Sequence, residues 1–206
     1  MVNRACAVVA ALFFLTLGAL GQEHRWDISL NASAVLNKKT AGNGVTQTPT
    51  SGRGFLATLR LNMGAKHSIE VNYARSYTAE KYVTPTLDYR FQTNVTEFSG
   101  AYVFSPFETE RFKPFLLGGA GAVVFNPYYE YIDFIPVSMM GVRQTQVGFL
   151  YGGGVDYRLP RVGSRFALRL QYRGLLFSAP NFKLQNLFTG AKGHMAEPSI
   201  GIVFKF

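Results

Sequence analysis

Apolar and polar residues alternate along much of the chain after Gln22. The clearest case is the segment 165–173, in which large apolar residues occupy every second position and Arg169, Gln171 and Arg173 lie between them. A period of two places successive side chains on opposite faces of a β-strand. This segment is therefore predicted to form a strand with one apolar face and one charged face.

Segments with this strand character recur along the whole chain. They cover residues 26–34, 55–62, 68–73, 95–104, 115–125, 144–159, 165–173 and 198–206. Two of them, 95–104 and 115–125, are apolar on both faces or rich in glycine, so the alternation leaves their phase open. No long apolar run and no extended 3.6-residue stripe follows Gln22, which excludes a bundle of membrane helices and a large helical domain.

The gaps between the predicted strands alternate in length. Long gaps at 37–51, 76–87, 126–141 and 177–193 alternate with short ones at 63–66, 105–113 and 160–164. Outer-membrane barrels are built with long loops at one end and tight turns at the other. We therefore predict an all-β fold, an eight-stranded antiparallel up-and-down transmembrane β-barrel.

A secreted β-sandwich is the alternative fold, because it too is built from alternating strands. A sandwich would enclose its large aromatic residues, whereas here many lie near strand ends, as in the aromatic girdles of membrane barrels. We place Trp26, Phe115 and Phe206 in the girdle at the short-turn end, and Tyr73 and Phe125 in the girdle at the long-loop end. Since a bilayer cannot satisfy open sheet edges, such a sheet must close on itself.

The first residues have the features of an export signal. Arg4 precedes an almost entirely apolar run from Ala5 to Leu17, and small residues suited to a signal peptidase follow. The run is too short for a transmembrane helix. We expect a signal peptide at 1–21, cleaved on export, and an outer-membrane β-barrel domain at 22–206. The one cysteine, Cys6, lies inside the signal, so no disulfide and no metal site are expected in the mature chain.

Composition and charge agree with a membrane location. Charged residues make up only 16% of the chain, against roughly 25% in soluble domains, while Phe, Tyr and Gly are abundant. This composition excludes disorder and a coiled coil. The formal net charge of +9 favours an anionic surface, for which we expect membrane lipid rather than nucleic acid.

The C-terminal residues match a known pattern. The sequence there combines a polar residue, a glycine and two alternating aromatic residues, the last at the chain end: Ser199, Gly201, Phe204 and Phe206. It resembles the C-terminal assembly signal of bacterial outer-membrane barrels. The resemblance implies that the barrel-insertion machinery is a partner during biogenesis.

The chain from Gln22 onward resembles the small eight-stranded barrels similar to outer-membrane proteins A and X. The fragments 113–121, 151–159 and 169–173 carry this resemblance. No part of the chain resembles the peptidoglycan-binding domain of the longer A-like proteins, so a tether to the cell wall is not implied. The glycine clusters in the first two fragments lack a following helix start, so we interpret them as room for lumen side chains and expect no cofactor.

Extending the alternation strand by strand places charged residues inside the barrel. The acids are Asp27, Glu70, Glu97, Asp156 and Glu197, and the bases are Arg60, Arg158, Arg169, Arg173 and Lys205. An interior of eight strands is only wide enough for side chains to fill, so these groups should pair and close the lumen. We expect Arg169 with Glu97 as the central pair. A gate that opens by exchanging partners is the alternative to a purely structural plug.

The long gap 126–141 carries the candidate interaction residues. Tyr128, Tyr129, Tyr131 and Phe134 lie in a segment expected outside the cell, where an exposed aromatic patch can mark a site for a surface ligand. The alternative is that the flanking strands extend beyond the membrane and these rings pack there. Basic residues in or beside the long gaps suit phosphate-rich lipopolysaccharide.

Three functions remain open at this level. The preferred one is a non-enzymatic barrel that serves envelope integrity and surface interaction through its loops. The first alternative is a narrow, low-conductance pore. The second is a lipid-modifying enzyme, for which His194 near Ser178 and Glu197 is the one candidate catalytic group at the outer rim.

Overall fold

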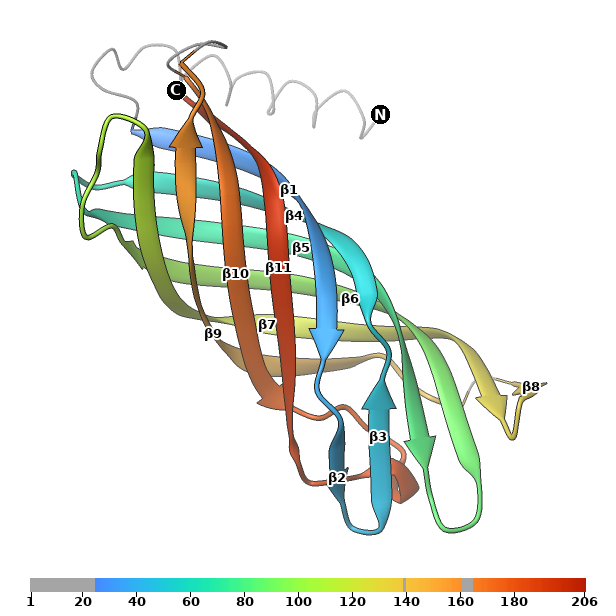
Figure 1. Cartoon of the computed structure of the whole chain (residues 1–206). Helices are drawn as coiled ribbons and strands as arrows, with labels where there is room; N and C mark the ends of the chain where they lie inside the picture. The colour runs from blue at the N-terminus through green and yellow to red at the C-terminus, as the bar shows by residue number, and fades with distance from the viewer. Residues whose placement is uncertain (1–24, 139, 161–164) are drawn as a thin grey trace, which may run out of the picture.

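The computed structural model describes residues 25–138, 140–160 and 165–206 (Figure 1). The predicted signal peptide at 1–21 lies outside these residues. The described chain is almost entirely β-structure, with one short 3-10 helix at Gln185–Leu187. No helix in this part of the protein is both long and apolar enough to cross a bilayer.

Eight long strands form a single closed barrel. They are β1 (Trp26–Asn37), β4 (Gly52–Asn62), β5 (His67–Val83), β6 (Asp88–Phe104), β7 (Phe112–Ile132), β9 (Gln144–Arg158), β10 (Phe166–Ser178) and β11 (Lys192–Lys205). Each strand pairs antiparallel with the next, and β1 pairs with β11 to close the sheet. The predicted fold class is confirmed. Closure leaves no open edge within the barrel wall, which is the condition for a sheet in lipid.

Three further short strands lie at one end of the barrel, which we call the loop end. The hairpin of β2 (Thr40–Gly42) and β3 (Val45–Pro49) continues the wall beyond β4, because β3 pairs with β5. The strand β8 (Ile135–Val137) folds back on the end of β7. We call the opposite end, with both described chain termini, the turn end (Figure 1).

Two of the predicted long loops are largely strand. The gap 76–87 reduces to the turn 84–87, because β5 and β6 remain paired from Ser76 opposite Val95 to Val83 opposite Asp88. The gap 126–141 is shortened in the same way by β7 and β8. The extension of β6 escaped prediction because its outward positions carry the polar residues Asp88, Arg90 and Gln92, so no apolar stripe marks it.

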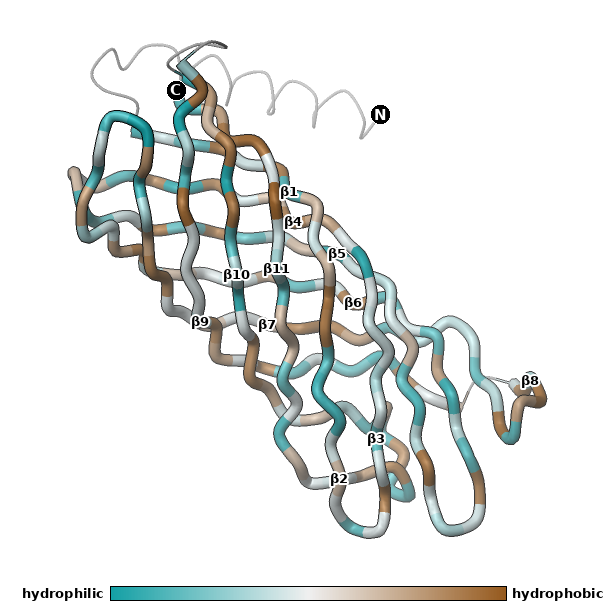
Figure 2. The backbone as a smooth tube through the Cα atoms, in the orientation of Figure 1, coloured by the Kyte–Doolittle hydropathy of each residue, from teal (hydrophilic) through white to brown (hydrophobic). Residues whose placement is uncertain are grey.

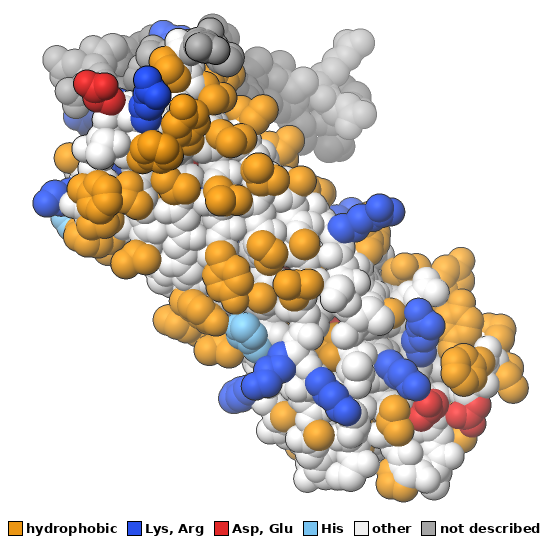
Figure 3. Space-filling view, in the orientation of Figure 1, with side chains coloured by type: hydrophobic (Ala, Val, Ile, Leu, Met, Phe, Trp, Pro, Cys, Tyr) orange, Lys and Arg blue, Asp and Glu red, His pale blue; other side chains and the backbone are white. Residues whose placement is uncertain are grey.

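Alternation of side chains gives the barrel two different surfaces. Outward positions such as Leu30, Val71 and Ile202 are apolar and exposed, while the intervening residues point inward and are buried. Figure 2 shows this alternation along β10 and β11, and Figure 3 shows hydrophobic side chains gathered over the barrel wall, with basic groups beyond them toward the loop end. Arg53 and Arg75 are exposed outward residues that mark the border of the apolar band.

The interior holds most of its charged groups nearer the turn end and many of its large apolar side chains nearer the loop end. Charged and hydroxyl side chains occupy the first region together with Phe115 and Val103. An apolar core that includes Phe91, Leu150 and Leu175 occupies the second region. The segment after β10 closes this core, because the ring centroid of Phe182 lies 4.6 Å from that of Phe91 and the Tyr82 hydroxyl donates to the Pro180 carbonyl at 2.7 Å.

Candidate functional site

The lumen nearer the turn end holds a first cluster of charges. The Arg169 guanidinium donates two hydrogen bonds to the Asp156 carboxylate, at 2.7 and 2.8 Å, and the two residues face each other on β10 and β9. Arg60 contacts Glu70 at 2.8 Å, and these two residues face each other on the paired strands β4 and β5. A 3.6 Å contact between Arg60 and Asp156 joins the two pairs across the lumen. Arg169 also lies 3.8 Å from Asp27 on β1.

An aromatic ring supports both guanidinium groups of this first cluster. The ring of Phe115 lies 4.4 Å from the Arg60 guanidinium carbon and 5.2 Å from that of Arg169. Such cation–π contacts add to the ion pairs when the groups are withdrawn from water. Gly154 makes room for the ring, since a Cβ there would lie 2.7 Å from a ring atom of Phe115. The sequence-based assignment of Phe115 to the aromatic girdle is therefore wrong, and so is that of Phe125, which is 2% exposed and lies in the apolar core.

A second cluster lies further toward the loop end. Arg173 donates to the Glu97 carboxylate at 2.8 Å and also to Glu197, which is its neighbour across β10 and β11. Ser99 donates to the other oxygen of Glu97 at 2.5 Å. One guanidinium thus holds two buried carboxylates, and it is the only base within ion-pair distance of them among the described residues.

Three details differ from the sequence-based expectation. Arg169 bonds to Asp156 rather than to Glu97, because alternation fixes which face a residue occupies but not its height along the barrel axis. Arg158 leaves the lumen, with a side chain 41% exposed that pairs with Glu108 at the turn end. Lys205 lies at the lumen rim opposite Asp27 and is only partly buried. The acids inside therefore outnumber the bases.

Beyond the border of the apolar band, a buried carboxyl connects the β2–β3 hairpin to the barrel. Glu80 on β5 accepts a hydrogen bond from the Gln47 amide at 2.8 Å, and Gln47 in turn accepts one from the Thr40 hydroxyl at 3.0 Å. No cation reaches Glu80 among the described residues, so burial raises its pKa to about 7, and the Gln47 hydrogen bond opposes this shift only in part. Sequence analysis missed this group because its partners are neutral and lie on a different hairpin.

The β7–β8 hairpin displays the predicted interaction residues. Tyr129 and Phe134 are 60% and 82% exposed, and the Tyr128 ring packs edge-on against Tyr129 at 5.3 Å. Tyr131 is half-buried on the outward face of β7. Buried Glu130 fixes the base of the hairpin, since its carboxylate accepts the backbone N–H groups of the returning segment at Met140 and Gly141. The rings thus lie on a hydrogen-bonded extension of the strands rather than on an irregular loop.

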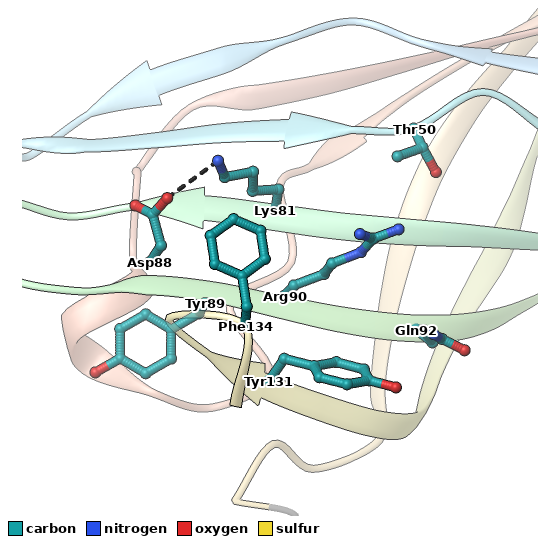
Figure 4. Close-up of a pocket in the computed structure, with 8 residues that line it drawn as sticks. All are labelled: Thr50, Lys81, Asp88, Tyr89, Arg90, Gln92, Tyr131 and Phe134. Atoms are coloured by element: carbon teal, nitrogen blue, oxygen red, sulfur yellow. Dashed lines mark ion pairs between the residues drawn. The ribbon is translucent and has the colours of Figure 1, made fainter. Parts of the chain in front are cut away.

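A groove of about 410 Å³ runs beside this hairpin on the outer wall of the loop end (Figure 4). Lys81 from β5, Arg90 and Gln92 from β6, and Tyr131 and Phe134 from the hairpin line it. The Lys81 ammonium lies 3.0 Å from the Asp88 carboxylate, whereas Arg90 forms no ion pair within the described chain. The volume of the groove falls in the range of roughly 300–1,000 Å³ that is typical of ligand sites.

Solvent-accessible bases dominate the loop end around this groove. They are Lys38, Lys39, Arg53, Arg75, Lys81, Arg90, Arg143, Lys183 and Lys192. The accessible acids described at this end are Asp88 and Asp133, while Glu80 and Glu130 are buried. The end of the molecule that carries the groove is therefore strongly positive, which attracts anions.

The residues considered for lipid-modifying catalysis do not assemble. His194 lies on the outward face of β11 and its Nε2 is 2.8 Å from the Tyr151 hydroxyl. Glu197 points into the lumen to Arg173, and the Ser178 hydroxyl accepts a hydrogen bond from Lys192 at 3.1 Å. Within the described residues, no group of three or more potential metal ligands comes together.

The C-terminal pattern lies in the seam that closes the barrel. Trp26 and Phe206 exchange backbone hydrogen bonds at 2.9 and 3.1 Å, and the Phe206 ring stacks on Phe204 at 6.0 Å. Gly201 is required by close approach, because a Cβ there would lie 2.1 Å from the Leu30 carbonyl oxygen on β1.

Phe206→Ala should strongly reduce assembly into the outer membrane, because it removes the terminal ring of both the seam and the predicted assembly signal. The measurement is the amount of heat-modifiable protein in outer-membrane fractions, since closed barrels resist detergent until heated. Phe107→Ala is the matched control, a loss of one exposed ring in a turn at the same end. Equal outer-membrane levels of both variants would contradict the role of Phe206 as a signal.

Comparison with known proteins agrees with the closed barrel. Residues 7–195 match the family described as outer membrane protein beta-barrel domain, and the chain belongs to this family. A search of the curated proteins found no match.

Several solved structures share the fold. The outer membrane protein OprG from Pseudomonas aeruginosa has a TM-score of 0.60 at 14% identity, over 90% of this chain and 98% of that one. Neisserial surface protein A has a TM-score of 0.52 at 16% identity, over 88% and 97%. Ail, the attachment invasion locus protein of Yersinia pestis, solved with the heparin analogue sucrose octasulfate, has a TM-score of 0.50 at 15% identity, over 88% and 99%. At these identities the likeness shows the fold alone. The chain is therefore a small outer-membrane β-barrel protein.

Proposed function

We propose that this protein is a non-enzymatic surface-interaction barrel of the bacterial outer membrane that also contributes to envelope integrity. In this proposal the signal peptide at 1–21 is removed on export and the loop end faces outside the cell, as in other outer-membrane barrels. The observation that carries the proposal is the rigid β7–β8 hairpin, which holds exposed aromatic rings beyond the apolar band next to a positive groove. Ail, a protein of the same fold, was solved with a heparin analogue, which supports a surface ligand for a barrel of this kind.

Two exposed side chains of this region, Tyr129 and Ile135, can be tested without changing the groove. Tyr129→Ser together with Ile135→Thr removes two exposed apolar side chains that do not line the groove. Because a buried interface side chain contributes on the order of 1 kcal/mol or more, the double variant should weaken attachment to cells or to other copies by about tenfold. Phe188→Ser, an exposed ring on the loop after β10, is the control. Undiminished attachment by the double variant would remove Tyr129 and Ile135 from the proposal.

The paired charges favour a closed lumen over the alternative of a narrow pore. The guanidinium groups of Arg60, Arg169 and Arg173 are held by carboxylates from neighbouring strands or from across the lumen. The apolar core fills the barrel between these clusters and the loop end. Purified protein in planar bilayers should therefore show no stable channels. Arg169→Ala should add at most a small leak, because the second cluster and the core remain. Large, stable channels from the unmutated protein would replace the proposal with the pore.

A further inference from the structure

Two like charges face each other on the wall of the groove. Lys81 and Arg90 are directly opposite in the register of β5 and β6, and both side chains lie on the outward face. Like charges in directly opposed positions destabilise a sheet. Asp88 compensates Lys81, but no described acid compensates Arg90. Figure 4 shows the Arg90 guanidinium directed away from Asp88, toward the side of the groove where Thr50 lies. The sheet thus retains an unfavourable pair that a ligand anion would relieve.

The ring of Phe134 is held over the same groove by an unfavourable turn. Asp133 and Phe134 are the two central residues between Ile132 and Ile135, with φ of 47° and 68°. Tight hairpin turns with positive φ at both centres favour Asn-Gly or Asp-Gly, and a bulky residue there is rare. The Asp133 carboxylate accepts the Asp88 backbone N–H at 3.0 Å, which fixes the turn against β6. Since the ring is mostly exposed, the strained position is not explained by burial.

We propose that this groove binds an anionic saccharide from outside the cell, through its sulfate or carboxylate groups and one apolar sugar face. This inference rests on the proposed function and names the ligand class of its site. Arg90 and Lys81 bind the acidic groups, since a guanidinium forms a planar fork that matches sulfate or carboxylate. Phe134 and Tyr131 supply flat apolar surfaces for the sugar ring, and Gln92 supplies amide donors and an acceptor for its hydroxyls.

The test uses the full-length mature protein, refolded in detergent micelles, and sucrose octasulfate as the probe in a calorimetric titration. Sucrose presents the same sugar without the charges, and inorganic sulfate presents the charge without the sugar. We expect sucrose octasulfate to bind and both fragments to bind at least about tenfold more weakly, because each lacks one half of the recognition. Comparable affinity for inorganic sulfate would overturn the saccharide part of the proposal.

Three variants distinguish binding in the groove from non-specific attraction of the anion to the positive end of the protein. Arg90→Gln should weaken binding by about tenfold or more, because it removes the guanidinium that binds the anion. Thermal stability should stay equal or rise, because the same change removes the like-charge pair. Phe134→Gly should weaken binding severalfold. Since glycine suits this turn better than phenylalanine, the loss of affinity cannot be attributed to a misfolded hairpin. Lys183→Gln removes an accessible base at the same end outside the groove and should change affinity less than about twofold. Equal losses for Arg90→Gln and Lys183→Gln, or full affinity in Phe134→Gly, would overturn the proposal.

A final arm decides where the saccharide comes from. The titration is repeated in bilayers that contain lipopolysaccharide, whose own acidic sugars are the alternative source. Retained affinity supports an external ligand, whereas loss of binding there would overturn it in favour of the membrane's own sugars. If the groove does not bind the saccharide, the proposed surface interaction is still tested separately by the Tyr129 and Ile135 double variant, because these substitutions leave the groove unchanged. Attachment that depends on Tyr129 and Ile135 but not on Arg90 would overturn this inference alone.

Discussion

Arg173→Ala is expected to lower the free energy of unfolding by about 3–5 kcal/mol at neutral pH, one of the two largest effects we anticipate. Removing one partner of a buried ion pair leaves the other charge uncompensated, which costs several kcal/mol. Here Arg173 holds two carboxylates, Glu97 and Glu197, and both would remain buried. The measurement is urea unfolding of the refolded barrel in micelles, followed by the heat-modifiable shift and by circular dichroism.

A triple variant tests whether the lost stability comes from the uncompensated carboxylates. Combining Arg173→Ala with Glu97→Gln and Glu197→Gln removes the uncompensated charges, so most of the lost stability should return. Arg75→Ala, the loss of an exposed outward base on β5, should stay within about 0.5 kcal/mol of the parent. If Arg173→Ala and Arg75→Ala were equally mild, the second cluster would not be a stabilising element.

Glu80→Gln is expected to stabilise the protein at pH 8 by about 3 kcal/mol and to have little effect near pH 4.5. The pKa of Glu80 is about 7 in the folded chain, against 4.5 for an ordinary glutamate, so the folded state holds this proton more tightly than the unfolded state. The contribution of Glu80 to stability is therefore most favourable below pH 4.5. It falls as the pH rises from 4.5 to 7 and is constant above that.

The comparison is made as a difference between variant and parent across this pH range, because other groups titrate as well. Gln47 and Thr40 face Glu80 from the β2–β3 hairpin, Tyr82 lies near it on β5, and Lys38 and His194 line the same small cavity. Glu110→Gln, at an exposed site in a turn, should give a flat difference. A flat difference for Glu80→Gln as well would show that its carboxyl is not held protonated by burial.

The class of fold could be predicted from the sequence because it follows from local periodicity. In the segment 165–173 alternation alone assigns each side chain to the lipid or to the lumen, and any register of a closed barrel preserves that assignment. The same rule correctly places Arg60, Asp156 and Arg169 inside. Aromatic residues near strand ends, such as Trp26 and Phe206, then favour a membrane barrel over a sandwich.

Pairing inside the lumen could not be predicted in this way. Arg169 lies beside Asp156, and Glu97 lies beside Arg173, because the stagger between strands sets the height of each residue. Period-two reasoning carries no information on stagger, which depends on hydrogen-bond register around the whole barrel. Phe115 was misassigned for a related reason, since its glycine-rich strand has no apolar stripe to fix the phase.

The sequence by itself thus determined the barrel, its two surfaces and the identity of most lumen charges, since these depend only on which neighbours alternate. Only the tertiary structure decided which charges meet, how far β5, β6 and β7 continue past the apolar band, and that Glu80 is buried without a cation. It also brought Arg90 and Phe134 to one groove. These features join residues from different hairpins, and their distances are set by strand stagger and by loop packing rather than by any pattern along the chain.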